Sequence, residues 1–212
     1  GKKNPPNNWR ACFGGSAWEY EEATGQFYLH LFSRKQPDLN WDNPKVREEV
    51  AAICNDWLEK GVDGFRCDVI TYISKPEDLY HASQDDVVVG PHWKQYMQEL
   101  SERSFNQFDT MIVGEAAGID FGRACEITRE GAGLLDMLFH FEHVGARAVC
   151  AYNQKTTDLR RWKRILFRWQ ELPEHSWGAL YYENHDQARS LPRFAPAGAH
   201  RAAAAKSLAV SL

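Results

Sequence analysis

The chain has 212 residues, a formal net charge of −4 at pH 7 and 43% hydrophobic residues. This length fits one ordinary domain with a core, and the composition is typical of a globular protein rather than a disordered or fibrous one. No apolar stretch approaches the roughly 20 residues that cross a bilayer. The basic run 160–164 lies on a predicted helix, where we interpret it as a solvated face rather than a nucleic-acid patch. We therefore expect neither a nucleic acid nor a membrane as a partner.

The segment before residue 43 is aromatic and rich in glycine, and it shows no helical period. The first helix is predicted to begin at Asn43-Pro44, with asparagine as the cap and proline at the first helical position. Gly61 is predicted to end it. Its apolar residues form one stripe at spacings of four, three and four: Val46, Val50, Ile53 and Trp57.

Beyond this helix, predicted strands and helices alternate along the chain. The predicted strands are 62–68, 110–114, 135–141 and 178–182. The further predicted helices are 92–108, 120–129, 158–170 and one from about residue 199 onward. Such an alternation indicates a parallel sheet with crossover helices, and four strands amount to about half of an α/β barrel.

Three acidic residues each follow a predicted strand: Asp68 in GVDGFRCDVI, Glu115 in TMIVGEAAG and Asp186 in ALYYENHDQAR. The active site of a parallel barrel lies at this end of the strands. Arg66 is two residues before Asp68 and shares its face, so its charge favours the ionised carboxylate that a nucleophile needs. Glu115 follows an apolar run, where low polarity raises the pKa and suits a proton donor. Two carboxyl groups in unlike environments indicate a glycosidase pair.

These residues also have plain structural interpretations. Asp68 could cap a helix, and Asp186 could belong to an ordinary turn. His140 and His143 could be metal ligands, but opposite parity on a strand separates them unless the strand has ended, and no close ligand set accompanies them. We expect no metal and no cofactor.

The five cysteines are odd in number and lack the close spacing of a zinc site or a disulfide framework: Cys12, Cys54, Cys67, Cys125 and Cys150. This pattern favours reduced thiols. Reduced thiols are typical of the cytoplasm, so we expect a cytoplasmic location.

The segments GFRCDVI, IVGEA and NHDQAR resemble the second, third and fourth signature segments of glycoside hydrolase family 13, the alpha-amylase superfamily. The run from PNNWR to PDLNW resembles the end of a small inserted domain in the oligo-1,6-glucosidase and alpha-glucosidase branch. The resemblance implies that residues 44–212 form a partial (β/α)8 TIM barrel, about strands 4 to 7. Residues 1–43 would be the remnant of inserted domain B. Because the family's first signature is absent, we expect an internal fragment.

The resemblance also implies roles for individual residues. Asp68 would be the nucleophile and Glu115 the general acid/base. Asp186 would bind sugar hydroxyl groups and stabilise the transition state. Arg66 and His185 would support these three acids.

Four further residues are candidates for substrate binding. The resemblance places Phe13 and Phe32 near the substrate cleft, although core packing is the ordinary role of such aromatics. Arg189 is a further candidate. In this family, valine directly after the nucleophile accompanies alpha-1,6 substrates, so Val69 favours that linkage; the alternative is a buried β-branched strand residue.

We therefore expect a retaining alpha-glucosidase, a hydrolase of the oligo-1,6-glucosidase type that acts on short alpha-linked oligosaccharides. The two catalytic carboxyl groups should lie roughly 5 to 6 Å apart. The isolated piece should be inactive, because a barrel closes only when every strand has two neighbours. One alternative is a trehalose-6-phosphate hydrolase, which needs a basic phosphate pocket. The other is a non-enzymatic heavy chain of an amino-acid transporter, which loses the catalytic acids and has a membrane anchor.

Overall fold

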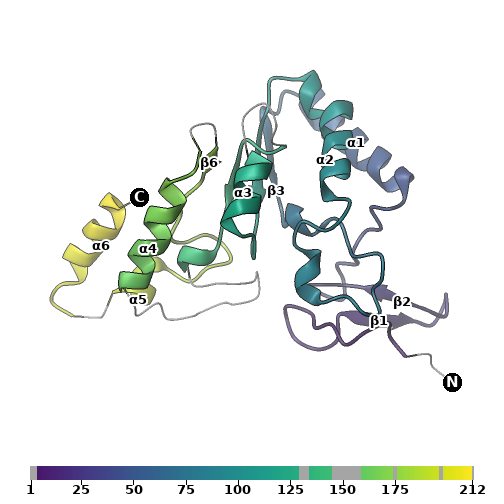
Figure 1. Ribbon diagram of the computed structural model, residues 1–212, viewed down its shortest axis with the longest axis horizontal. Helices are drawn as coiled ribbons and strands as arrows, with labels where there is room; N and C mark the ends of the chain where they lie inside the picture. The colour runs from purple at the N-terminus through teal and green to yellow at the C-terminus, as the bar shows by residue number, and fades with distance from the viewer. Residues whose placement is uncertain (1–3, 129–133, 145–158, 174–175, 196–197, 212) are drawn as a thin grey trace. The chain divides into compact units, whose positions relative to one another are not determined.

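The structure is a computed structural model (Figure 1). It describes residues 4–128, 134–144, 159–173, 176–195 and 198–211. The chain forms two compact units, Gly1–Asp63 with Thr71–Thr110 and Gly64–Ile70 with Met111–Leu212. One of the three points at which the chain passes between the units falls within the short 3-10 helix η1 (Ile70–Tyr72). The predicted domain boundary at residue 43 stays a prediction.

The first unit combines a hairpin with two helices. Its strands β1 (Trp18–Glu21) and β2 (Gln26–Leu29) pair antiparallel, which the sequence analysis did not predict. Helices α1 (Pro44–Glu59) and α2 (Trp93–Arg103) contact one another. Two short 3-10 helices also belong to this unit, η2 (Gln84–Val87) and η3 (Phe105–Gln107). A core cluster joins the N-terminal segment to η2 through Trp9, Ala17, Leu31 and Val87.

Helix α1 begins where the sequence predicts. The Asn43 side chain accepts a hydrogen bond from the Lys45 N–H at 3.1 Å, so it caps the helix. The predicted apolar stripe is wrong at Ile53 and Trp57, which are 58% and 51% exposed. The buried positions are instead Ala51 and Leu58. Periodicity predicts an apolar face, but the neighbouring elements decide which face becomes buried.

The second unit contains a four-stranded parallel sheet in the order β3-β4-β5-β6. Its strands are β3 (Gly64–Cys67), β4 (Met111–Glu115), β5 (Met137–Phe139) and β6 (Trp177–Gly178). All four predicted strands exist and are parallel, so the predicted sheet is confirmed. Strand β6 departs most from the prediction, because the chain leaves the ladder after the Ala179 N–H donates to the Leu138 carbonyl at 2.9 Å.

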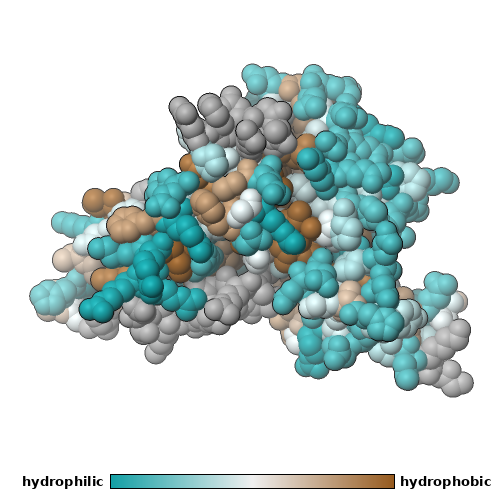
Figure 2. All heavy atoms as spheres, viewed as in Figure 1, coloured by the Kyte–Doolittle hydropathy of each residue, from teal (hydrophilic) through white to brown (hydrophobic). Residues whose placement is uncertain are grey.

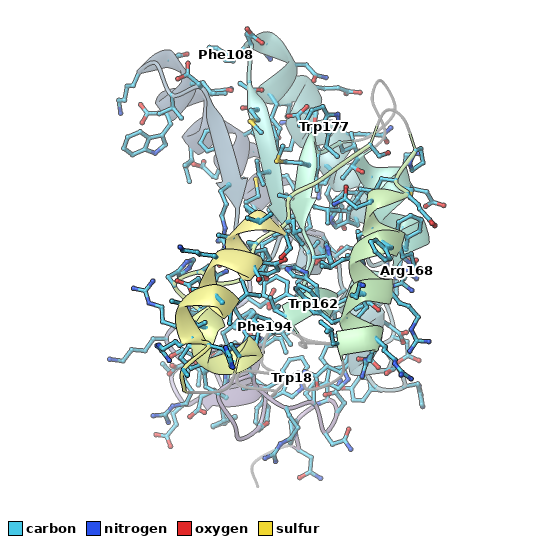
Figure 3. All side chains as sticks on the ribbon, turned by 90° about the vertical axis from the view of Figure 1, so that its left-hand side faces the viewer. Trp18, Phe108, Trp162, Arg168, Trp177 and Phe194 are labelled. Carbon is cyan, nitrogen blue, oxygen red and sulfur yellow. The ribbon has the colours of Figure 1, made fainter. Side chains whose placement is uncertain are left out.

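Four helices accompany this sheet: α3 (Phe121–Thr128), α4 (Leu159–Gln170), α5 (Ser190–Phe194) and α6 (Arg201–Val210). A 3-10 helix, η4 (Glu142–Val144), follows β5. The short helix α5 was not predicted. It contacts α6, and the Phe194 ring of α5 lies 5.9 Å from the Trp162 ring of α4 (Figures 1 and 3).

The basic run on α4 is exposed to solvent at Arg160, Arg161, Lys163 and Arg164. Figure 2 shows strongly hydrophilic side chains over much of this helix. Along the same helix, Ile165 and Trp169 are buried. Helix α4 therefore packs by an apolar face and presents its charges to water, as the interpretation of a solvated face requires.

The cysteines depart from the expectation of reduced thiols. Cys54 and Cys125 are thiols whose pKa burial raises. Cys12, however, is disulfide-bonded, so that expectation is wrong at this position. The cytoplasmic location stays a prediction. Within the described ranges, no helix combines the length and the apolar character needed to cross a membrane.

Candidate active site

Two of the predicted acids are placed by the register of neighbouring strands. Cys67 of β3 pairs with Gly114 of β4, and the next residues along the two strands are Asp68 and Glu115. Parallel strands present their carboxyl ends at one edge, so both acids lie at that edge of the sheet. A side chain on Gly114 would meet Leu135 within 2.5 Å. Glycine therefore lets the chain pack closely just before Glu115.

Arg66 joins the two acids. Its Nη1 donates to the Asp68 carboxylate, and its Nη2 donates to Glu115 Oε2 at 2.6 Å. The predicted pairing of Arg66 with Asp68 is present, but its sharing with Glu115 was not foreseen. Burial alone lowers the pKa of Arg66. The hydrogen bond to Asp68 and the charges of Glu115, Asp68 and Asp186 outweigh burial and raise it, so one permanent cation serves all three acids.

The environments of the two paired acids differ strongly. The side chain of Asp68 is 69% exposed, whereas that of Glu115 is 3% exposed. Burial raises the pKa of Glu115, and a hydrogen bond with Asp68 raises it further. The Arg66 charge and the Val69 N–H, which donates to Glu115 Oε2 at 3.3 Å, act in the opposite direction. The net direction is upward because desolvation is the largest effect.

Val69 has an unusual backbone conformation. Its φ is 37°, in the left-handed region, where a β-branched residue is disfavoured by roughly 1–2 kcal/mol. Strand β3 ends at Cys67, so the alternative of an ordinary strand residue is wrong. The left-handed turn directs the Val69 N–H toward Glu115. Strain of this kind clusters at functional sites.

Asp186 is not positioned by the end of a strand, unlike Asp68 and Glu115. It lies well beyond the end of β6, in the irregular segment before α5, rather than at the end of a strand. The Asn184 side chain accepts hydrogen bonds from the Asp186 and Gln187 N–H groups at 2.9 and 2.8 Å. This turn is made by Asn184, so the Asp186 carboxyl group remains available. His185 Nε2 lies 3.2 Å from Asp186 Oδ2.

The remaining candidates are not gathered around Arg66 by any observed contact. Arg189 is 84% exposed and pairs with Glu183 at 2.6 Å. Phe13 and Phe32 belong to the first unit, where their rings pack edge to face at 6.2 Å. Their contact with substrate stays a prediction.

Sequence reasoning missed Tyr181. Burial raises the pKa of its phenol, and the Glu115 charge raises it further. Its hydroxyl is buried and has no hydrogen-bond partner among the described residues. The tyrosine doublet in ALYYENHD was the available signal. The described residues include no group of three or more His, Cys, Asp or Glu side chains that could bind a metal ion.

The fold and the site define part of an α/β barrel with a carboxylate pair at the carboxyl edge of its parallel strands. The model of the alpha-amylase catalytic domain matches residues 1–212, so the chain belongs to that family. The family prediction and the predicted partial barrel are therefore confirmed.

Curated relatives show which members of this family the chain resembles. The chain is 43% identical over 219 residues to an oligo-1,6-glucosidase of Bacillus cereus, covering 98% of this chain and 39% of that protein. It is 39% identical over 219 residues to a trehalose-6-phosphate hydrolase of Bacillus subtilis, covering 98% of this chain and 38% of that protein. Both names denote glycoside hydrolases. The chain thus spans about two fifths of the length of these relatives.

A solved structure is also similar to this chain. The trehalose-6-phosphate hydrolase of Bacillus licheniformis superposes with a TM-score of 0.81 at 36% identity. The match covers 92% of this chain and 37% of that one. The described elements therefore have the same arrangement as about 37% of that chain.

Proposed function

We propose that the intact protein containing this chain is a retaining alpha-glucosidase that hydrolyses terminal alpha-1,6 bonds of short oligosaccharides. The observation that supports this most is the pair of unlike carboxyl groups, Asp68 and Glu115, joined through Arg66. Both carboxyl groups also accept from the same Arg66 guanidinium, which favours retention because an inverting pair needs a wider gap of about 6.5–9.5 Å.

In the first step the exposed Asp68 carboxylate attacks the anomeric carbon and forms a glycosyl ester. Glu115 is buried and its pKa is raised, so it donates its proton to the leaving oxygen. The bond from the anomeric carbon to that oxygen breaks, and the leaving sugar departs with the proton.

In the second step Glu115 acts as a base. Once Asp68 is esterified it has no charge, and its contribution that raises the pKa of Glu115 disappears. The nearby Arg66 cation then lowers the pKa of Glu115 without that opposition. Glu115 can therefore take a proton from water, which attacks the anomeric carbon and releases glucose and the Asp68 carboxylate.

Asp186 would bind hydroxyl groups of the terminal glucose, supported by His185 at 3.2 Å. Charged hydrogen bonds of this kind strengthen as charge develops on the sugar ring in the transition state. The alpha-1,6 linkage is proposed from Val69 and from the name of the Bacillus cereus relative.

The test is the configuration of the first-formed product. The intact protein is mixed with 4-nitrophenyl alpha-glucoside, whose only sugar product is the glucose of the cleaved bond, and proton NMR follows the anomeric signals before mutarotation. Alpha-glucose as the first product supports the proposal. Beta-glucose contradicts retention, and an absence of glucose release contradicts the function itself.

A trehalose-6-phosphate hydrolase is the second candidate, because relatives of that name are 39% and 36% identical to this chain. Hydrolysis of isomaltose and of trehalose 6-phosphate, measured side by side, separates the two. A non-enzymatic scaffold is disfavoured, because the chain retains three acids around Arg66, with the pKa of Glu115 raised.

A further inference from the structure

The segment with Asp186 leaves the sheet early. Strand β6 ends at Gly178, and the last ladder-like contact is the Ala179 N–H to the Leu138 carbonyl at 2.9 Å. From there to α5 the described chain has no helical or strand structure. Contacts other than a strand ladder, made within the segment and by other elements, therefore hold it in place.

One such contact comes from His143, which lies in η4 and is fully buried. Its Nε2 hydrogen bonds with the Tyr181 carbonyl. Its ring also lies edge to face with the Tyr181 ring at 5.1 Å. His143 thus contacts both the backbone and the side chain of the segment just beyond β6.

His140 supports His143 from the other side. The two Nδ1 atoms are 3.4 Å apart, and the His140 ring stacks on Trp169 of α4 at 3.7 Å and 6°. Glu142 also connects this segment to α4, because it accepts hydrogen bonds from Arg168 and from Trp169 Nε1, the latter at 3.1 Å. Residues 140–144 therefore connect helix α4 to the segment that contains Tyr181.

The hydrogen bonds determine the tautomers of the two rings. A carbonyl oxygen only accepts, so His143 Nε2 must carry the proton. In the neutral ring, His143 Nδ1 is then an acceptor, and His140 Nδ1–H is its donor. The donor chain runs from His140 through His143 to the Tyr181 carbonyl.

Both rings are neutral at ordinary pH. Burial lowers the pKa of His143 to about 4, where Arg193 lowers it as well and the Tyr181 carbonyl and Glu142 oppose it. Burial, His143 and Arg168 lower the pKa of His140 to about 2.

We propose that His143 is a positioning residue of the active site: its hydrogen bond to the Tyr181 carbonyl holds the segment that presents Asp186 to the substrate. The inference rests on the proposed glucosidase function. Tyr181 and Asp186 belong to the same segment, and Asp186 acts electrostatically on both Tyr181 and Arg66. Movement of this segment would therefore displace Asp186 from the other two acids.

The experiment compares two substitutions of His143 in the intact protein. His143→Phe keeps the ring contact but removes the donor, and His143→Gln retains an amide N–H that can replace Nε2–H. We expect His143→Phe to lower kcat for 4-nitrophenyl alpha-glucoside about 100-fold, as for a displacement of about 1 Å. His143→Gln should stay within about tenfold of the wild type.

A background variant separates positioning from general damage. If His143 acts through Asp186, His143→Phe should cost little further activity in an Asp186→Asn background, because the two losses are not additive. Ile127→Ala is the matched control, since it removes buried volume from α3, which is not part of this segment. It should lower Tm without a comparable loss of kcat. Equal losses from His143→Phe in both backgrounds would overturn the proposal.

Amide hydrogen exchange tests the inference independently of catalysis. The Asp186 and Gln187 N–H groups are bonded to Asn184, so their exchange reports order in this segment. Exchange there should rise in His143→Phe and remain near wild type in His143→Gln and Ile127→Ala. Unchanged exchange in His143→Phe would refute the positioning role. A wild type without hydrolysis would refute the proposed function instead.

Discussion

Asp68 and Glu115 are placed by the backbone, whereas Asp186 is placed by side chains. The first two follow paired positions of β3 and β4, so the register of a parallel ladder sets their spacing. Asp186 follows a strand of two residues, and its segment is bonded by His143 and the Asn184 turn. A ladder of backbone hydrogen bonds tolerates most side-chain changes, but a contact made by one imidazole does not.

The two regions also differ in how they hold charge. On the β3–β4 side, Arg66 is a permanent cation between two carboxyl groups. On the β6 side, two buried imidazoles are neutral and act by hydrogen bonding and ring contacts. Substitutions on the β3–β4 side should therefore mainly change the rate of the chemical steps. Substitutions on the β6 side should mainly change the position of Asp186.

The largest effect should come from Asp68 on the backbone-placed side. Asp68→Asn removes the nucleophile and cannot form the glycosyl ester, so kcat for isomaltose should fall about 10⁴-fold or more. Glucose release by the purified intact protein measures this. Its fold is checked by circular dichroism, because Asp68 is exposed and its replacement should leave Tm nearly unchanged. Near-normal turnover would mean that another residue attacks the sugar.

Glu115→Gln, also on the backbone-placed side, should affect the formation of the glycosyl ester differently for two substrates. Turnover of isomaltose should fall about 100- to 10,000-fold, because its leaving group needs a proton. A substrate with a good leaving group, 4-nitrophenyl alpha-glucoside, should still form the glycosyl ester and show a burst of nitrophenol. Stopped-flow absorbance detects the burst. The absence of a burst would argue against Glu115 as the acid, because slow turnover after the burst is expected from the loss of the base in the second step.

A smaller change is expected at Val69, which belongs to the backbone-placed region and whose N–H donates to Glu115. Val69→Ala or Val69→Thr should shift the ratio of isomaltose to maltose hydrolysis toward maltose. The shift should be about tenfold to a few hundredfold, as for a methyl-scale change in a pocket. The ratio of kcat/KM values for the two sugars measures it, and an unchanged ratio would remove the support for the alpha-1,6 linkage.

The smallest effect concerns stability against pH and should arise from the β6 side. The pKa values of His140 and His143 are lowered in the folded state to about 2 and about 4. Their contribution to stability is therefore complete above the unfolded value of about 6.5 and falls as the pH drops toward 4. Each histidine can contribute a slope of up to about 1.4 kcal/mol per pH unit.

Replacement of a histidine should reduce this slope. Urea midpoints of the intact protein at pH 7 and pH 5 should differ less for His143→Gln than for the wild type. An exposed histidine provides the control, and His185→Gln should leave the difference unchanged. If the urea midpoint of the wild type did not decrease from pH 7 to pH 5, the buried pair would not be neutral in the folded state.

Local patterns in the sequence determined much of the architecture. The cap at Asn43, the four parallel strands and the placement of Asp68 and Glu115 directly after or at the end of strands were all predictable. Each depends on residues within a few positions of one another, where periodicity and capping chemistry act. The signature segments around the acids indicated the family for the same reason, and the family match agrees.

Only the tertiary structure decided how those parts meet. Arg66 donates to Glu115 across 49 positions of sequence, and His143 hydrogen bonds with the Tyr181 carbonyl across 38. The exposure of Ile53 was likewise unpredictable from its spacing. Contacts of this kind depend on strand register, on where a strand leaves its ladder and on which faces pack. Local propensity cannot specify them, because it describes each segment without its neighbours.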